Sequence, residues 1–254
     1  VRVIEPDEQA FSGFVFKIHA NLDPRHRDRM AFLRVCSGTF EKDKPFFHVR
    51  RRKDIRFSRP YNFMAERKVV VDAAFPGDVV GLYDRGDLKI GDTLTEGEAF
   101  HFQGIPSFAP EIFRELISTD PMRSKQLDKG IQQLSEEGVA QLFVQNRGRR
   151  KIIGTVGELQ FEVIQHRLTH EYGAACKLVP LPYHKACWIT SEDKRALDEF
   201  TKYRDSQLAY DRDENPVYLS ESEWMLQAMI RDNPKISFHF TSEFKRQSPA
   251  DSIA

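Results

Sequence analysis

The spacing of apolar residues in the second half of the chain predicts helices set between strands. Residues 154–173 indicate the end of a strand, a turn with two glycines and a helix. Along that helix Phe161, Ile164, Leu168 and Tyr172 recur every three or four residues and form one apolar stripe. The glycine at position 173 favours the left-handed conformation that ends a helix. The stretch therefore predicts an amphipathic helix packed against a sheet.

A second helix is predicted from Asp120 to Gly138. Asp120 can cap its first turn, and Pro121 suits the first helical position. Its predicted buried edge consists of Leu127, Ile131 and Leu134. Strand-like segments flank the two helices at residues 108–118, 139–145, 151–156 and 174–179. The order β-α-β-β-α-β predicts a ferredoxin-like split βαβ unit, an α/β domain of the α+β type with both helices on one side of the sheet.

Residues 10–100 indicate short strands separated by turn residues, without a long amphipathic helix. Alternating apolar runs lie at residues 10–20 and 30–37, and valine-rich runs lie at residues 69–71 and 79–82. Short strands at this interval are typical of a closed antiparallel barrel. We therefore expect an antiparallel β-barrel domain over residues 1–104 and the α/β domain over residues 105–254. Within the latter, further helices are expected at 192–205 and 221–231, strands at 215–219 and 235–240, and a polar tail from residue 242.

Composition and charge add to this picture. A chain of 254 residues with 40% hydrophobic and 30% charged residues supports two packed domains, and no apolar run is long enough to span a membrane. The formal net charge is zero, but residues 25–59 hold twelve Lys/Arg against four Asp/Glu, whereas residues 192–232 hold eleven Asp/Glu against six Lys/Arg. Three cysteines without regular spacing indicate reduced thiols in the cytoplasm, packed as small apolar side chains. A first residue other than methionine leads us to expect a fragment of a longer protein.

Two basic tracts are the candidate binding sites. We expect contacts with RNA phosphates from a set of loop cations: Arg50, Arg51, Arg52, Lys53, Arg147, Arg149, Arg150 and Lys151. Both tracts fall where loops leave a rigid scaffold, which is where phosphate contacts are usually placed. The alternative for each is a solvated loop tip that serves solubility alone. A third, weaker candidate is the segment 23–29, which carries Arg25, Arg27 and Arg29.

Signals for enzyme chemistry are weak. The segment 86–93 has the glycine spacing of a phosphate-binding loop, but Asp92 stands where the lysine of that motif belongs and would repel a phosphate. Glu162, His166 and His170 follow at intervals of four on one helix face, opposite the apolar stripe, and no further ligand accompanies them. We therefore predict no catalytic residue, no metal site and no cofactor site in this chain.

The chain resembles the translational GTPases. In the first domain the resemblance is carried by the stretches 31–38, 76–82 and 91–94, which are similar to the β-barrel second domain of that family. In the second domain the stretches 107–111, 133–143, 154–163 and 206–209 are similar to bacterial peptide chain release factor 3. Two local departures stand out: Asp43 and Pro45 occupy a turn where the family has glycine, and the 147–151 hairpin is more basic than in the family.

The resemblance implies a function. It implies the ribosome-binding effector part of a GTP-dependent release factor that stimulates translation termination and recycles the class I release factors. The amino-terminal G domain of that family, which binds GTP or GDP with magnesium and hydrolyses GTP, would precede Val1, so the chain itself would carry no GTPase chemistry. The implied partners are ribosomal RNA and proteins, the class I release factors and the missing G domain. A cytoplasmic monomer without membrane contact is expected.

Three other interpretations remain open at this stage. The chain could hold the equivalent domains of an elongation-factor-like GTPase, because the barrel stretches are shared. It could be a free-standing enzyme that uses the face of Glu162, His166 and His170, which predicts a bound transition metal. It could also be a general RNA-binding module, which would not prefer ribosomes over other structured RNA.

Overall fold

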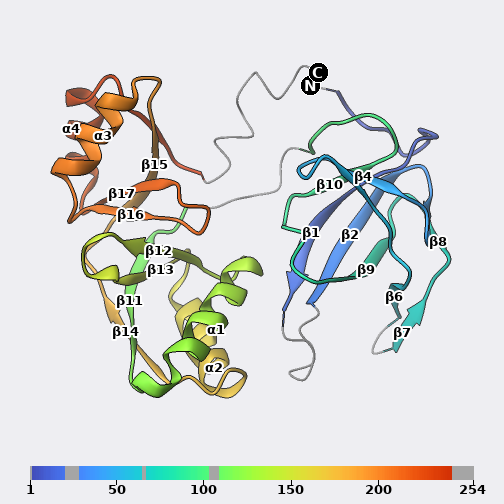
Figure 1. Cartoon of the computed structure of the whole chain (residues 1–254), viewed down its shortest axis with the longest axis horizontal. Helices are drawn as coiled ribbons and strands as arrows, with labels where there is room; N and C mark the ends of the chain where they lie inside the picture. Colours follow the sequence, from blue (N-terminus) through green and yellow to red (C-terminus); the bar gives the residue numbers. More distant parts are fainter. Residues whose placement is uncertain (1, 21–28, 65–66, 103–108, 242–254) are drawn as a thin grey trace. The chain divides into compact units, whose positions relative to one another are not determined.

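The structure is a computed structural model that describes residues 2–20, 29–64, 67–102 and 109–241. The chain divides into two compact units, the first built from residues up to 106 and the second from residues 107 onward, with the short segment 136–138 grouped with the first. The predicted domain boundary at residues 104 and 105 lies outside the described residues. Figure 1 labels the elements of both units.

The first unit is an antiparallel β structure around one apolar core. An eight-stranded sheet has the order β5-β4-β10-β1-β2-β9-β6-β7, and β3 pairs separately with β8. The core comes mainly from phenylalanine, leucine and valine side chains such as Phe11, Phe46 and Leu33, which are no more than 1% exposed. The strands are β1 (Ser12–His19), β2 (Arg29–Ser37), β3 (Phe40–Glu41), β4 (Phe46–His48), β5 (Lys53–Ile55), β6 (Pro60–Met64), β7 (Arg67–Val70), β8 (Ala73–Ala74), β9 (Val79–Asp84) and β10 (Thr93–Thr95).

The predicted closed barrel is only partly seen. The antiparallel strands surround a single core, but among the described residues the hydrogen-bonded order has two ends, β5 and β7, instead of forming a ring. The edge strand β5 has three residues and carries the exposed charges of Lys53 and Asp54. Short, charged edge strands resist further pairing, so the sheet forms a barrel-like half that ends there.

The second unit begins with the predicted order of elements. It comprises β11 (Ile112–Ser118), the 3-10 turn η1 (Pro121–Arg123), α1 (Ser124–Glu136), β12 (Gln141–Gln145), β13 (Lys151–Thr155), α2 (Glu158–His170) and β14 (Cys176–Pro180). The four strands are all antiparallel and have the order β14-β11-β13-β12, which is the connectivity of a split βαβ unit. The domain is therefore of the α+β type, with an antiparallel sheet.

Both predicted helices form for the expected reasons. Asp120 caps the first turn by accepting a hydrogen bond from the backbone N–H of Met122 at 2.9 Å, and Gly173 has φ +62° at the end of α2. The apolar stripes of α1 and α2 are buried against the sheet. At the crossing of the helices, Gly130 lets them approach closely, because a Cβ there would lie 2.7 Å from Leu168 Cδ2 and 2.9 Å from Tyr172 Cγ.

The rest of the chain repeats the same connectivity, which the sequence pattern did not predict. The elements are β15 (Lys185–Thr190), α3 (Lys194–Tyr203), β16 (Leu208–Tyr210), β17 (Pro216–Ser220), α4 (Glu223–Asp232) and β18 (Ser237–His239). Their strands have the order β16-β17-β15-β18, and β12 pairs with β16, so the two halves join into one eight-stranded sheet. The helices expected at 192–205 and 221–231 are α3 and α4. The strands β15 and β16 were missed.

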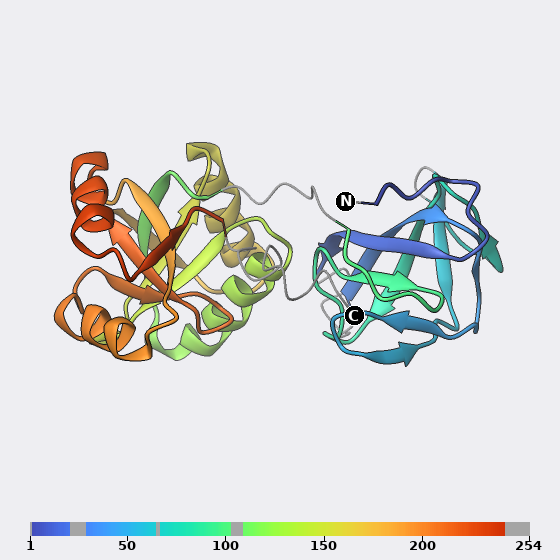
Figure 2. The same cartoon turned by 90° about the horizontal axis from the view of Figure 1, so that it is seen from above.

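The two halves share a core between their helix-free faces. Alternate positions of each strand point away from the helices of their own half, and these side chains pack together across the halves. Phe143 of β12 and Trp188 of β15 lie 6.0 Å apart between ring centroids, and Phe113 of β11 lies 6.2 Å from Phe143. Figures 1 and 2 show α1 and α2 on one side of this unit and α3 and α4 on the other, with the strands between them.

The buried and exposed faces of α2 lead to a stability prediction. Replacing the fully buried Leu168 by alanine removes apolar contacts and leaves a cavity beside α1, so we expect a loss of about 2–5 kcal/mol in the free energy of unfolding. Replacing Leu159 by alanine on the opposite face of the same helix, where 74% of the side chain is exposed, changes little. Urea titrations of both variants measure the difference. Equal stabilities would show that the buried stripe is misassigned.

Candidate nucleic-acid interface

The first basic tract forms the tight turn between β4 and β5. His48 pairs with Lys53 in the register of these strands, and Arg52 has φ +51° in the turn. Arg50 donates from Nε to Asp92 Oδ1 at 2.6 Å and from Nη2 to Asp92 Oδ2 at 2.7 Å, and it also bonds the carbonyl of Asp87 at 2.7 Å. Arg51 forms an ion pair with Asp87. The turn is thus tied to the loop that follows β9.

Asp92 is the centre of this arrangement. Its carboxylate is fully buried and accepts hydrogen bonds from Arg50, from the backbone N–H of Lys89 at 2.8 Å and from His48 Nε2 at 2.9 Å. His48 is also fully buried, and its Nδ1 has no partner among the described residues, so the hydrogen is assigned to Nε2. Burial raises the pKa of Asp92, but the bonds from Arg50, His48 and Lys89 outweigh it and lower the pKa to about 2.

Two cations of the first tract are exposed beyond this anchor. Arg52 and Lys53 face solvent, and neither has an ion-pair partner within the described part of the chain. Because the turn is held by the pairs of Arg50 and Arg51, the backbone that carries these exposed cations is fixed. Half of the predicted cations in this tract are therefore free to meet a phosphate, and the other half already bind carboxylates.

The loop after β9 also explains the glycine spacing that resembled a phosphate-binding loop. The carboxylate of Asp84 accepts hydrogen bonds from three backbone N–H groups, those of Gly86 at 3.1 Å, Asp87 at 2.9 Å and Leu88 at 3.2 Å. Asp84 also pairs with the buried guanidinium of Arg29 at 2.7 Å. The amides that could cradle a phosphate thus already donate to an internal carboxylate.

The second basic tract forms the tip of the hairpin between β12 and β13. A short 3-10 turn, η2 (Arg147–Arg149), contains two successive residues with positive φ, Gly148 at 73° and Arg149 at 52°. The hairpin base is anchored by the buried Gln145, whose Nε2 donates to the carbonyl of Ser206 at 2.7 Å and to the hydroxyl of Tyr183 at 3.0 Å. The tip therefore projects from a fixed base.

The cations of the second tract divide in the same way as those of the first. Arg150 binds Glu115 through two bonds of 3.0 and 2.6 Å, which lower the pKa of that carboxyl, and Lys151 pairs with Asp128. Arg147 and Arg149 are exposed without an ion-pair partner in the described segments. The two tracts belong to different units. The third predicted tract lies outside the described residues apart from Arg29, which is buried and paired with Asp84.

The residues of the predicted metal alternative and the predicted packed cysteines can also be placed. The rings of His166 and His170 stack 4.1 Å apart on the exposed face of α2, and His170 Nδ1 bonds the carbonyl of His166 at 2.9 Å. No group of three or more possible metal ligands occurs among the residues that the structure describes. Cys176 and Cys187 are buried free thiols, and burial raises the pKa of Cys187 to about 12.

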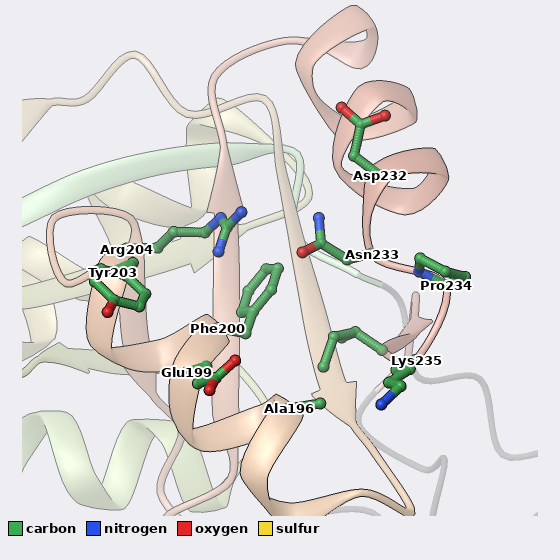
Figure 3. A pocket seen from close by; sticks show the side chains of 10 residues that line it. Ala196, Glu199, Phe200, Tyr203, Arg204, Asp232, Asn233, Pro234 and Lys235 are labelled. Carbon is green, nitrogen blue, oxygen red and sulfur yellow. The ribbon is translucent and has the colours of Figure 1, made fainter.

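A pocket of about 380 Å³ lies between α3 and the segment that joins α4 to β18, and no sequence pattern indicated it. Figure 3 shows Arg204 and Asn233 on either side of the Phe200 ring. The guanidinium of Arg204 lies 4.2 Å from the centre of that ring, and Asn233 Nδ2 donates to the carbonyl of Met229 at 2.8 Å. Lys235 likewise pairs with Asp193 at 2.9 Å. Arg204, Asn233 and Lys235 are thus engaged within the protein.

Comparisons with known proteins match both units. The family model described as class II release factor RF3, C-terminal domain, matches residues 102–230, and that described as elongation factor G domain 2 matches residues 10–97. A similar solved structure is the crystal structure of ttk003000868 from Thermus thermophilus, with a TM-score of 0.58 and 21% identity over 73% of this chain. The chain spans 29% of the length of that protein. No helix in the described ranges is long and apolar enough to cross a membrane.

The depressed pKa of Asp92 leads to a prediction on acid stability. Its pKa is about 2 in the folded chain against 3.8 for the free side chain, so its stabilising effect is complete above about pH 4 and is lost as pH falls towards 2. The difference corresponds to about 2 kcal/mol. We expect Asp92→Asn to be less stable than the wild type at pH 6 and to lose less stability between pH 4 and pH 2.

Urea titrations followed by far-UV circular dichroism at each pH measure this effect. Asp54→Asn is the matched control, because Asp54 is exposed in the neighbouring strand β5 and has no ion pair among the described residues. If Asp92→Asn and the wild type lose the same stability between pH 4 and pH 2, the buried carboxylate is not ionised as described.

Proposed function

Because the chain belongs to the class II release factor RF3 family, we propose that it is the ribosome-binding effector part of a GTP-dependent peptide chain release factor. In this proposal it stimulates translation termination in the cytoplasm and helps to dissociate the class I release factors from the ribosome. The observation that supports it most is the match of the release-factor model over residues 102–230, in the unit that distinguishes this family from other translational GTPases.

The exposed cations supply the physical means of ribosome binding. We propose that Arg52 and Lys53 in the first unit, and Arg147 and Arg149 in the second, contact phosphates of ribosomal RNA. Contacts to phosphates provide affinity and orientation without reading sequence, which suits a factor that binds a fixed surface. In this proposal Arg50, Arg51, Arg150 and Lys151 serve a different purpose: their carboxylate partners hold the loops in place.

We propose that these two units take no part in nucleotide chemistry. Both matching family models describe domains other than the G domain, and the loop after β9 binds the carboxylate of Asp84 instead of a phosphate. We propose that GTP or GDP, with magnesium, binds a G domain of the parent protein, and that the present chain acts as a monomer whose placement on the ribosome follows that domain. Ribosomal proteins and the class I factors are the further partners in this proposal.

Two alternatives are weaker. An elongation-factor-like GTPase is compatible with the match of the first unit over residues 10–97, but not with the release-factor match of the second. A general RNA-binding module is compatible with the exposed cations alone. Competition distinguishes the latter: bulk structured RNA displaces a general module from ribosomes, whereas it leaves a ribosome-specific factor bound.

The salt dependence of ribosome binding tests the proposed contacts. We expect the wild-type chain to bind purified bacterial ribosomes with an affinity that falls steeply with KCl concentration. The slope of log affinity against log salt should fall by about one unit for each phosphate contact removed. The variant that removes these contacts has glutamine in place of Arg52, Lys53, Arg147 and Arg149. Sedimentation with ribosomes over a series of KCl concentrations measures the slope.

The control removes the same charge elsewhere. Lys125, Lys129, Lys194 and Lys202 are exposed on α1 and α3, and none has an ion pair within the described ranges. The variant with these four lysines changed to glutamine should keep the wild-type slope. Equal slopes for both variants would show that the basic tracts are only solvated loop tips.

The assignment of nucleotide binding to another domain gives a separate prediction. A fluorescent GDP analogue with magnesium should show no saturable binding to the purified chain at micromolar concentrations, because the amides of the loop after β9 are engaged by Asp84. Fluorescence anisotropy during a titration measures this. Stoichiometric binding would place a nucleotide site in these units. It would refute the proposal that GTP or GDP binds a G domain of the parent protein and not this chain.

A further inference from the structure

The helix-free face of the second unit's sheet is covered unevenly. Phe113 and Ile152 lie on this face and are at most 1% exposed, because the second half of the unit packs on them. Towards the edge strand β14 the cover ends: Ile117 of β11 and Val179 of β14 are each 41% exposed. Leu116 and Cys176, at the alternate positions, point to the helices instead. We call the exposed part of this face, made by Ile117, Lys177 and Val179, the open margin.

The strand register brings a further lysine towards the basic hairpin. Lys177 of β14 pairs with Ile117 of β11, and the neighbouring Leu116 pairs with Lys151 of β13. Continuing the register by one residue sets Arg150 beside Ile117, and Arg150 has the extended backbone that this requires, with φ −62° and ψ 132°. Two strand spacings separate the Cα atoms of Lys177 and Arg150 by about 10 Å. Figure 1 shows β14 next to β11 at the edge of the sheet.

The open margin itself carries a positive charge, that of Lys177. Glu115 on the same face is neutralised by its two bonds to Arg150. Lys177 is exposed and, like Arg147 and Arg149, has no ion-pair partner in the part of the chain that the structure describes. The open margin and the hairpin tip therefore form a continuous band in which uncompensated cations border exposed aliphatic side chains. That combination complements a ligand with regularly spaced negative charge and apolar sugar faces, and does not complement a folded acidic protein surface, whose carboxylates are less regularly spaced.

We propose that the open margin binds the sugar–phosphate backbone of an RNA strand, with Lys177 on one phosphate, Arg147 and Arg149 on others, and Ile117 against the riboses between them. Val179, on the far side of Lys177 from the hairpin tip, contacts the continuation of the strand. This inference rests on the proposed function and deepens it, because it extends the RNA contact of the second unit from a hairpin tip to a sheet surface. It also adds Lys177 to the residues that hold the strand.

The test compares Lys177→Gln with Lys202→Gln, an equal loss of charge on the exposed side of α3. Binding of the full chain to purified bacterial ribosomes and to single-stranded poly(U) RNA is measured over a series of KCl concentrations. For Lys177→Gln we expect the slope of log affinity against log salt to fall by about one unit on ribosomes, with unchanged thermal stability. For Lys202→Gln we expect the wild-type slope. A wild-type slope for Lys177→Gln on ribosomes overturns the inference.

The poly(U) series separates the inference from the proposed function. Suppose that the wild-type chain does not bind ribosomes but binds poly(U), and that the slope of log affinity against log salt depends on Lys177. The proposed function then fails, and the open margin is still supported as an RNA-binding surface. If it binds neither, both are refuted. If ribosome binding depends on Arg147 and Arg149 but not on Lys177, the proposed function remains and the inference fails.

A photo-cross-linking side chain identifies directly which molecule binds the open margin. Placed at Val179, it should cross-link to ribosomal RNA in the bound complex, because this side chain is partly exposed beside Lys177. Placed at Lys202, it should give no cross-link. A cross-link from position 179 to a ribosomal protein, without one to RNA, would overturn the inference and assign the margin to a protein partner.

Discussion

The shared core of the second unit is the constraint on which the rest of that unit depends. Each half has the connectivity of a split βαβ unit, whose helices cover one face of a four-stranded sheet and leave the other face apolar and open. The halves cover each other, with Phe143 of one and Trp188 of the other in contact. The connection between them is short: β12 and β16 pair only through Val144 with Tyr210 and Gln145 with Ala209. Because Gln145 also forms the base of the basic hairpin, packing of the halves fixes where that hairpin projects.

Both basic tracts follow one physical plan. An inner arginine is clamped by a carboxylate, Arg50 by Asp92 and Arg150 by Glu115, each through two hydrogen bonds. The paired, planar geometry of such a bond fixes the backbone of the turn more firmly than a single contact. Other cations of the same turns are left exposed on that ordered backbone: Arg52 and Lys53 in the first tract, Arg147 and Arg149 in the second. A phosphate that binds them does not have to order the loop first, so less conformational entropy is lost on binding.

Sequence reasoning succeeded where a signal was local and periodic. The caps and apolar stripes of α1 and α2 fixed the first split βαβ unit. The strand β15 was missed because its buried run from Ala186 to Ile189 faces apolar surroundings on both sides and shows no alternation, and β16 was missed because it has three residues. The division of the cations into clamped and exposed ones depends on pairs such as Arg50 with Asp92, 42 positions apart, which no local pattern reveals. The only hint was a carboxylate at position 92 where a phosphate-binding loop requires a lysine.

The repeated connectivity of the second unit allows its two halves to be compared at equivalent places. In the first half the margin between β11 and β14 carries the exposed Lys177 next to aliphatic side chains. In the second half the corresponding strands are β15 and β18, and there Thr190 and His239 hydrogen-bond each other at 2.7 Å across the strands. Burial lowers the pKa of His239, so this hydrogen-bonded pair is uncharged near neutral pH. The same connectivity therefore carries a lysine at one margin and a histidine–threonine pair at the other. The two halves differ here in their side chains, so the proposed binding role rests on particular residues and not on the fold.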